Sequence, residues 1–427
     1  MKKKYICALL ISSMLLGSST FIFAADAKET TIVAEATADK TSSSSKEENS
    51  SASTVPIQSK LSLSEAIKIM QTTGTSAETA ELNRQSDESI AKGYAESVKS
   101  IKEAFDSLDQ LQYLLNVNYP GVSRSDYMTA SSSAEAAGAT ATNEKIMKLR
   151  RDFAKEQGEN NYKAELNSIE YTTVQIYSGV LLAQDNLKIT QDNLKVQQEI
   201  LKNTETQFKV GMVAQKDVLS AQSAVESAKS DVQAAETSLE TAKMKFNFLL
   251  GYPVTEKITF TDTLTELPAP TASLDDSIQS ALKNRNEIKG ANFAKEVHAI
   301  LLESLAYRYP KNSSTYLKQQ VASLQAEKTA KDAPNQIEID IRTQKSKLED
   351  LKVALESAKS TETYAKEGYR LTSLSYQAGM CTLSELQQTQ VLSYKASLGV
   401  AAAINDYNLA IYQFKYATNV GTTRLPL

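Results

Sequence analysis

The chain has 427 residues, of which 41% are hydrophobic and 23% charged, and this balance favours an ordered protein over a disordered one. Its formal net charge of -4 argues against a nucleic-acid-binding protein, which would need a basic face. With only 14 glycines and 8 prolines the sequence offers few turns, so it predicts a small number of long helices.

Residues 1–25 have the form of a secretory signal peptide, in which lysines precede an apolar run that ends in small residues. The alternative is an uncleaved anchor helix, which the Ser and Gly residues in this short run disfavour. Cleavage would remove three lysines and no acid, so the formal charge would fall from -4 to -7. It would also remove Cys7 and leave Cys381 alone, so that no intrachain disulfide could form.

Residues 26–60 are rich in Ser and Thr and have no apolar period, so they are predicted to form a flexible tether. Two related segments follow, residues 61–251 and 272–421, joined by a linker at 252–271 and followed by a tail at 422–427. A shift of 168 residues places "FKVGMVAQ" on "YQAGMCTL". The linker contains "KITFTDTL", the one convincing strand-like run outside the predicted helices.

Apolar residues recur every seven positions on both sides of Gly211 and of Gly379, which is the signature of a coiled coil. The first line before Gly211 is Val180, Leu187, Leu194, Leu201 and Phe208; the line after it is Val218, Val225, Val232, Leu239 and Phe246. The second half repeats this design with two exceptions, Glu362 and Ser393. Glycine can take a left-handed conformation where a helix ends, so each glycine marks the tip of a hairpin. The prediction is a mainly α fold: long antiparallel coiled-coil helical hairpins in two tandem repeats, with little or no β structure.

The phrases "VGMVAQKDVLSAQSAVESAKSDVQAAETSLETAKMKFNFLLGYP" and "AGMCTLSELQQTQVLSYKASLGVAAAINDYNLAIYQFKYATNVG" resemble the hairpins of the TolC family of outer-membrane efflux proteins. The opening "LSLSEAI" and the run "ALKNRNEIKGANFAKEVHAILLESLAYRYP" also resemble that family, so the similarity covers roughly residues 61–421. The resemblance implies a homotrimer whose hairpins form a hollow α-cylinder. It also implies two partners, a periplasmic adaptor of the membrane fusion type and an inner-membrane pump, together with contact with a membrane.

The resemblance also implies site residues. The hairpin tips that would dock the adaptor are Val210, Gly211, Met212, Ala378, Gly379 and Met380. The pore constriction would be bordered by Asp217, Glu385 and Gln388, where Gln388 replaces the second acid of the family's pattern. Asp217 and Glu385 can equally be acids that stabilise the start of a helix, because the helix dipole favours a negative charge there.

One feature of the family is not evident in the sequence. Family members insert β-hairpins into the membrane, and such strands need about 9–11 residues of alternating character. The corresponding segments, residues 118–147 and 306–341, do not alternate, apart from "QIEIDI". We therefore expect helices or disorder in place of these strands; the alternative is that the strands are too degenerate for their periodicity to be recognised.

Motifs of enzymes are absent from the sequence: it has no phosphate-binding loop, no zinc-binding set and no nucleophile elbow. His298 is the only histidine, and no second thiol accompanies Cys381, so we expect no catalytic, metal or cofactor site. Two functions remain open: a TolC-like efflux or secretion conduit, and a non-transporting scaffold of the cell envelope. An adaptor fits less well, since adaptors pair one hairpin with strand-rich domains. The expected location is the outer membrane and periplasm, or the extracytoplasmic envelope without membrane insertion.

Overall fold

The computed structural model describes residues 60–427, so the predicted signal peptide and the tether up to residue 59 lie outside the described residues. The first half contains the helices α1 (Leu63–Thr72), α2 (Thr75–Asn116), α3 (Arg124–Ala136), α4 (Ala141–Lys209) and α5 (Gln215–Leu250). The second half contains α6 (Leu274–Asn284), α7 (Asn286–Arg308), α8 (Ser314–Gln377) and α9 (Leu383–Ala417). The strands that are described, β1 (Lys60–Leu61) and β2 (Thr259–Phe260), are two residues long. The predicted fold class, mainly α with little β, is confirmed.

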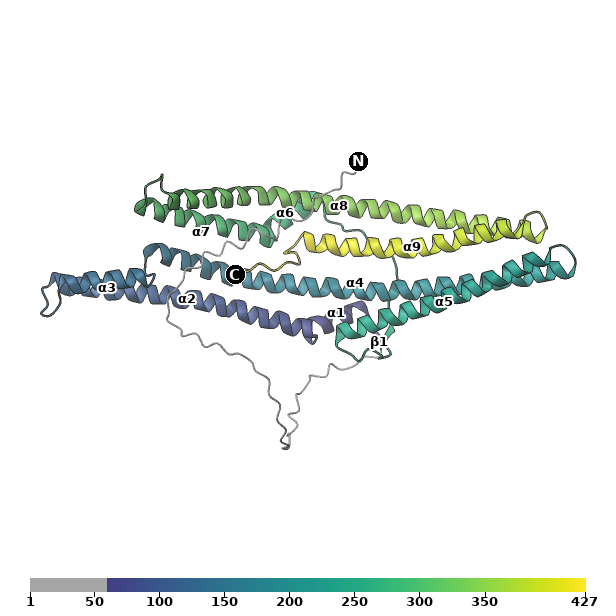
Figure 1. The fold of residues 1–427 in the computed structure, drawn as a ribbon, viewed down its shortest axis with the longest axis horizontal. Helices are drawn as coiled ribbons and strands as arrows, with labels where there is room; N and C mark the ends of the chain where they lie inside the picture. Colours follow the sequence, from purple (N-terminus) through teal and green to yellow (C-terminus); the bar gives the residue numbers. More distant parts are fainter. Residues whose placement is uncertain (1–59) are drawn as a thin grey trace, which may run out of the picture. The chain divides into compact units, whose positions relative to one another are not determined.

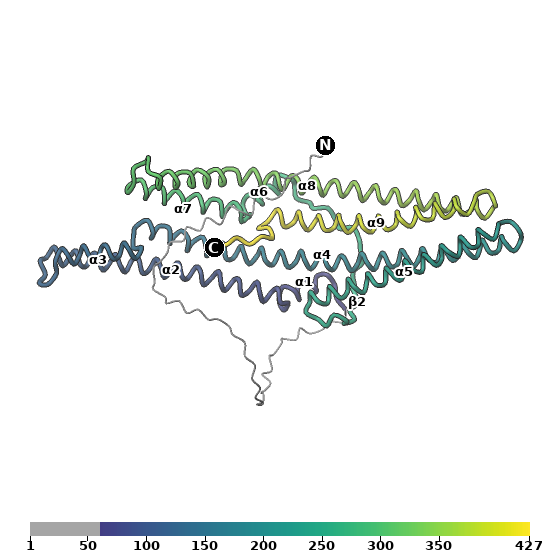
Figure 2. The backbone as a smooth tube through the Cα atoms, in the orientation of Figure 1, coloured from purple at the N-terminus to yellow at the C-terminus, as the bar shows by residue number. Residues whose placement is uncertain are grey.

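Two long hairpins organise the described chain (Figures 1 and 2). Helix α4 packs along α5, and α8 packs along α9. The two hairpins are joined because α4 also contacts α9. The inner helices are therefore α4 and α9, while α5 and α8 each keep one side without a long partner helix among the described residues.

At the other end of the long helices, α2 packs along α4 and α7 packs along α8. The segment 118–147 consists of α3, its flanking loops and the first turns of α4. The segment 306–341 consists of the end of α7, a short loop and the first part of α8. The helices expected at these places are therefore present. None of the helices between residues 60 and 427 has an apolar stretch of the length and hydropathy that a membrane span requires.

The heptad lines form the core of each hairpin. Val180, Val225 and Leu239 are buried in the first hairpin, and Ile341, Leu348 and Leu355 in the second. Phe208 differs from the prediction, because it is 44% exposed. It lies one residue before the end of α4, where the chain turns away from its partner helix, and Thr204 is buried one turn earlier instead.

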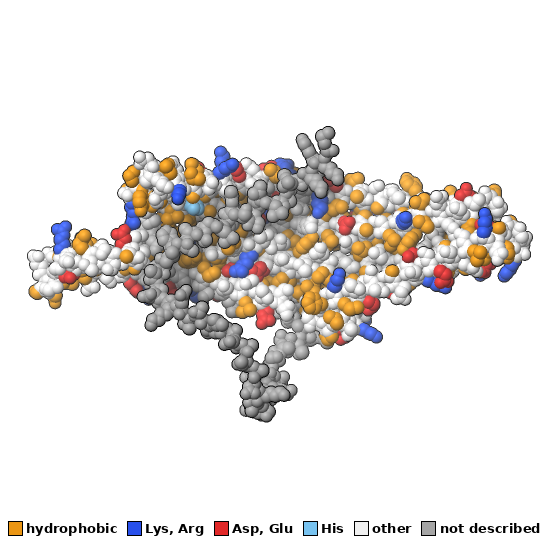
Figure 3. Space-filling view, in the orientation of Figure 1, with side chains coloured by type: hydrophobic (Ala, Val, Ile, Leu, Met, Phe, Trp, Pro, Cys, Tyr) orange, Lys and Arg blue, Asp and Glu red, His pale blue; other side chains and the backbone are white. Residues whose placement is uncertain are grey.

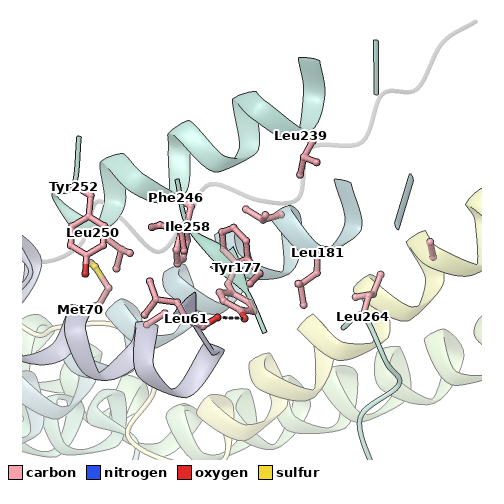
Figure 4. Close-up of a cluster of buried hydrophobic side chains, with 14 residues drawn as sticks. Leu61, Met70, Tyr177, Leu181, Leu239, Phe246, Leu250, Tyr252, Ile258 and Leu264 are labelled. Carbon is pink, nitrogen blue, oxygen red and sulfur yellow. Dashed lines mark hydrogen bonds between the residues drawn. The ribbon is translucent and has the colours of Figure 1, made fainter. Parts of the chain in front are cut away.

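An aromatic cluster packs α4, α5 and β2 together near the start of the first half (Figure 4). The rings of Tyr177, Phe246 and Phe260 lie 5.1–5.7 Å apart between centroids and meet edge to face. The Tyr177 hydroxyl lies 3.1 Å from the carbonyl oxygen of Leu61 and 2.8 Å from a carboxylate oxygen of Asp262. The same carboxylate accepts the N–H of Leu63 at 2.7 Å. These bonds hold β1 beside β2 in a parallel pair and so fix where α1 begins.

The C-terminal tail contacts both halves. Arg424 forms an ion pair with Asp87 of α2, whose side chain is only 2% exposed. Asn161 of α4 donates to Asp87 at 3.1 Å and to the carbonyl of Leu425 at 2.8 Å, and it accepts the N–H of Leu425 at 2.9 Å. The Asn286 amide of α7 donates to the carbonyl of Thr423 at 3.3 Å. The tail therefore ties the second half to the first through a buried charge.

Candidate functional site: the paired hairpin tips

Glycine makes the first tip. Gly211 has a φ of 78°, in the left-handed region that a side chain disfavours. The N–H of Gly211 donates to the carbonyl of Phe208 and that of Met212 to the carbonyl of Gln207, both at 2.9 Å. This is the Schellman arrangement that ends a helix. The N–H of Ala214 then donates to the Asp217 carboxylate at 3.1 Å, and α5 begins.

The second tip repeats the first. Gly379 has a φ of 72°, and the N–H of Met380 donates to the carbonyl of Ser375 at 2.8 Å. The Thr382 hydroxyl accepts the N–H of Glu385 at 3.2 Å, while the Glu385 carboxylate accepts the N–H of Thr382 at 2.8 Å. This reciprocal capping box starts α9, and the bonds from Thr382 lower the pKa of Glu385. The first tip lacks half of it, because Ala214 has no side-chain acceptor.

The two tips lie side by side. A Cβ atom built on Gly379 would lie 3.4 Å from the terminal methyl carbon of Met212. The Thr204 hydroxyl lies 2.9 Å from the hydroxyl of Tyr376, and the Gln207 amide donates to the carbonyl of Tyr376 at 3.1 Å. The structure thus brings together residues from two segments of the chain that lie far apart in the sequence.

The six residues predicted for docking are all exposed. Among them are three large apolar side chains, with Val210 67%, Met212 59% and Met380 77% exposed. Exposed apolar side chains that gather at one place are typical of a protein–protein contact. Elsewhere on the visible face, hydrophobic and charged side chains are interspersed, without a large block of one charge (Figure 3).

The three residues predicted for the pore lie at the starts of two neighbouring helices, since Ser220 of α5 lies 3.4 Å from Gln387 of α9 through their side chains. Asp217 lies in the first turn of α5 and Glu385 in the first turn of α9, each holding the N-terminal end of its own helix. Gln388 lies one turn beyond Glu385 and is exposed. Asp217 and Glu385 therefore do act as acids at helix starts, which is the alternative that the sequence left open.

Sequence reasoning missed a layer of buried amides between α4 and α9. The Gln197 side chain donates to the Gln390 side-chain carbonyl at 2.6 Å, and the Gln390 amide donates to Asn193. These three side chains are buried, with exposures of 4–9%. Asn193 and Gln197 are four residues apart and so share one face of a helix, but this spacing alone does not show that α9 covers that face. Buried amides pair only in one register, so they align the two repeats.

The residues weighed for chemistry have structural surroundings. The Cys381 thiol donates to the carbonyl of Thr372 at 3.4 Å, and burial raises its pKa, which disfavours the reactive thiolate. His298 lies 3.1 Å from the side-chain amide of Gln319 through its Nδ1 atom. From residue 60 onward, no group of three or more His, Cys, Asp or Glu side chains is placed to hold a metal ion.

Comparisons with known proteins agree with this geometry. The family model described as "Outer membrane efflux protein" matches residues 152–252, which span most of the first hairpin. A sequence comparison with curated proteins finds no match. Among solved structures, the outer membrane protein VceC from Vibrio cholerae has a TM-score of 0.60 at 12% identity, over 84% of this chain and 97% of that chain.

Two further solved structures have a similar fold. The outer membrane channel CmeC from Campylobacter jejuni has a TM-score of 0.58 at 12% identity, over 84% of this chain and 86% of that chain. A membrane protein from Pseudomonas aeruginosa has a TM-score of 0.52 at 11% identity, over 65% of this chain and 72% of that chain. At these identities the likeness concerns the fold.

The family match bears on function as well. The match of residues 152–252 to efflux proteins supports an efflux role and a location in the cell envelope. The expected resemblance to the TolC family is confirmed: residues 152–252 match the outer membrane efflux protein family, and the described helices have the fold of TolC-like channels.

Proposed function

We propose that the chain is the conduit subunit of an efflux or secretion system, in which three copies form a helical channel and the hairpin tips dock a periplasmic adaptor. The observation that carries this proposal is the pair of unpartnered apolar edges on α5 and α8. The transported substrate and the pump are not specified by these residues. The conduit would act in the outer membrane and periplasm, or in the extracytoplasmic envelope.

The edge of α8 is the outer side of this helix, where four large apolar side chains are exposed among polar ones. Ile339, Val353, Tyr364 and Leu371 are 52–78% exposed. At about 100° per residue, they lie on the side of the helix opposite the buried heptad line that faces α9. Large apolar side chains that share one outer side of a helix are consistent with a surface that a second copy covers.

The edge of α5 has the same character. Leu219, Met244 and Phe248 are 43–77% exposed and lie opposite the side of α5 that packs on α4. Because the two edges belong to different helices, α5 of one copy would pack on α8 of the next. Such a head-to-tail contact closes into a ring when the rotation between copies allows it. That the ring has three members comes from the resemblance to the TolC family.

The tips support the docking role. Val210, Met212 and Met380 are exposed at a turn where glycine leaves the backbone open, and neither tip has a further partner in the described chain. In a ring, these apolar tips would form one rim. The adaptor expected from the resemblance would bury that rim.

The test is the mass of the purified chain in solution, measured by mass photometry or sedimentation, in plain buffer and in detergent. We expect a trimer for the wild type and a monomer for the edge variant Val353→Glu with Tyr364→Glu. Leu82→Glu is the matched control, since Leu82 is 58% exposed on α2, away from both edges. A wild-type chain that stays monomeric at high concentration in both media would contradict the proposal.

A non-transporting envelope scaffold is the second candidate, favoured by the helical segments 118–147 and 306–341. Deletion of the gene followed by a dye-accumulation assay separates the two. Increased dye in the deletion strain, reversed by the wild-type gene and not by the edge variant, supports the conduit. Unchanged accumulation together with a weakened cell surface supports the scaffold.

A further inference from the structure

The two exceptions to the second half's heptad pattern lie at one cavity. Glu362 of α8 and Ser393 of α9 occupy positions where the pattern predicts apolar residues, and both line a cavity of about 290 Å³ between α4, α8 and α9. A polar side chain in a coiled-coil seam costs stability unless it is paired. Two polar exceptions at the same place leave a cavity in the seam that apolar side chains would otherwise fill, and such a cavity is a candidate ligand site.

The cavity contains a partly buried negative charge whose partner is more exposed than the charge itself. The Glu362 carboxylate accepts the Lys366 ammonium at 2.7 Å; the Glu362 side chain is 23% exposed and that of Lys366 is 59% exposed. Burial raises the pKa of Glu362, but hydrogen bonds from Lys366 and Ser397 outweigh it and lower this pKa overall. The carboxylate is therefore ionised at neutral pH, while the lysine can move into solvent.

The walls of the cavity suit a cation with an apolar body. Tyr369 and Tyr394 both line it, and the ring faces of tyrosine attract cations. The Tyr394 hydroxyl lies 3.2 Å from that of Thr190, which holds this ring in place. Asn193 and Gln390 also line the cavity, and their mutual hydrogen bond fixes both amides.

We propose that this cavity binds a small protonated amine, with Glu362 as its counter-ion and Lys366 displaced into solvent. The Lys366 ammonium shows that such a group fits beside the carboxylate. The volume lies at the low end for ligand pockets, which restricts the ligand to a small molecule. The cavity lies within one chain, so this inference does not depend on ring formation.

The experiment is isothermal titration calorimetry of the purified chain with benzylamine, and with benzyl alcohol as the uncharged analogue. We expect wild-type protein to bind the amine, and Glu362→Gln to weaken this binding about tenfold or more, since a charge-assisted hydrogen bond is lost. Glu367→Gln is the matched control, because Glu367 is an exposed acid on the same helix, paired with Arg370. It should bind like the wild type.

Two further variants keep the test decisive if Glu362→Gln folds poorly. Lys366→Met removes the competing ammonium and should tighten binding by about twofold to fivefold. Ser393→Leu restores the apolar heptad position, so it should raise the melting temperature and abolish binding by filling the cavity. Equal binding of amine and alcohol, binding that Glu362→Gln leaves unchanged, or binding that survives in Ser393→Leu would overturn the proposal.

Discussion

Removing the positive charge of Arg424 should leave a buried carboxylate without its counter-ion. Asp87 is 2% exposed and is paired with Arg424, and Asn161 is its other hydrogen-bond donor. Breaking a fully buried pair costs about 3–5 kcal/mol. The Arg424 side chain is 34% exposed and Asn161 remains in place, so we expect Arg424→Met to lower the free energy of unfolding by about 2–3 kcal/mol.

The assay is urea unfolding followed by far-ultraviolet circular dichroism. The double variant Asp87→Asn with Arg424→Met removes both charges and should recover to within about 1 kcal/mol of the wild type. Arg342→Met is the control, because its partner Glu338 is 41% exposed; it should change stability by less than about 0.5 kcal/mol. If Arg424→Met is as stable as this control, or if the two changes simply add, the tail is not held by a buried charge pair.

Three further predictions concern the hairpins. Gly379→Ala should destabilise the chain by about 1–2 kcal/mol, because the backbone of Gly379 is left-handed. Gly399→Ala should stabilise the chain by about 0.5–1 kcal/mol, because Gly399 lies within α9 and has open space around it. Both changes are measured as shifts of the urea midpoint, and equal effects would refute the argument that Gly379 is needed for the turn. Leu355→Ala should cost about 2–5 kcal/mol, since this side chain is fully buried, while Val353→Ala in the monomer should cost less than about 0.5 kcal/mol. The pKa of Glu385 is lowered below 4.5 by its bonds to Thr382, so its contribution to stability is complete above that pH and is lost as the pH falls through the lower folded-state pKa. Melting temperatures on the acid side should therefore depend less on pH in Glu385→Gln than in the wild type, and an equal dependence would show that the capping bond contributes nothing.

The sequence predicted the hairpins because their determinants are local. Gly211 and Gly379 end helices through bonds to residues within one turn, and the heptad spacing identifies the buried side of each arm. The exposure of Phe208 was not predictable in this way, because its position depends on where the partner helix diverges from α4. Likewise, β1 is too short for an alternating pattern and is defined only by its pairing with residues 259–260.

The contacts between the halves were beyond local reasoning. Asp87 and Arg424 are 337 residues apart, and Gln197 and Gln390 are 193 residues apart. Nothing in the neighbourhood of a polar residue on a helix tells whether a distant segment will cover it. The six residues named for the tips are exposed, because a turn at the end of a hairpin has no further chain to cover it, while their docking role stays a prediction.

The tips are alike in sequence, but they should not be equally firm. At the second tip, α9 begins with the Thr382 hydroxyl, which accepts the N–H of Glu385. At the first tip, Ala214 has no hydroxyl, and only its backbone carbonyl accepts the N–H of Asp217, at 3.0 Å. The opening turn of α5 should therefore fray more readily than that of α9. In a closed ring, helix starts that fray more readily would alternate with ones that fray less readily around the rim of tips. Two copies of one hairpin would then form a binding edge whose alternate tips differ in flexibility.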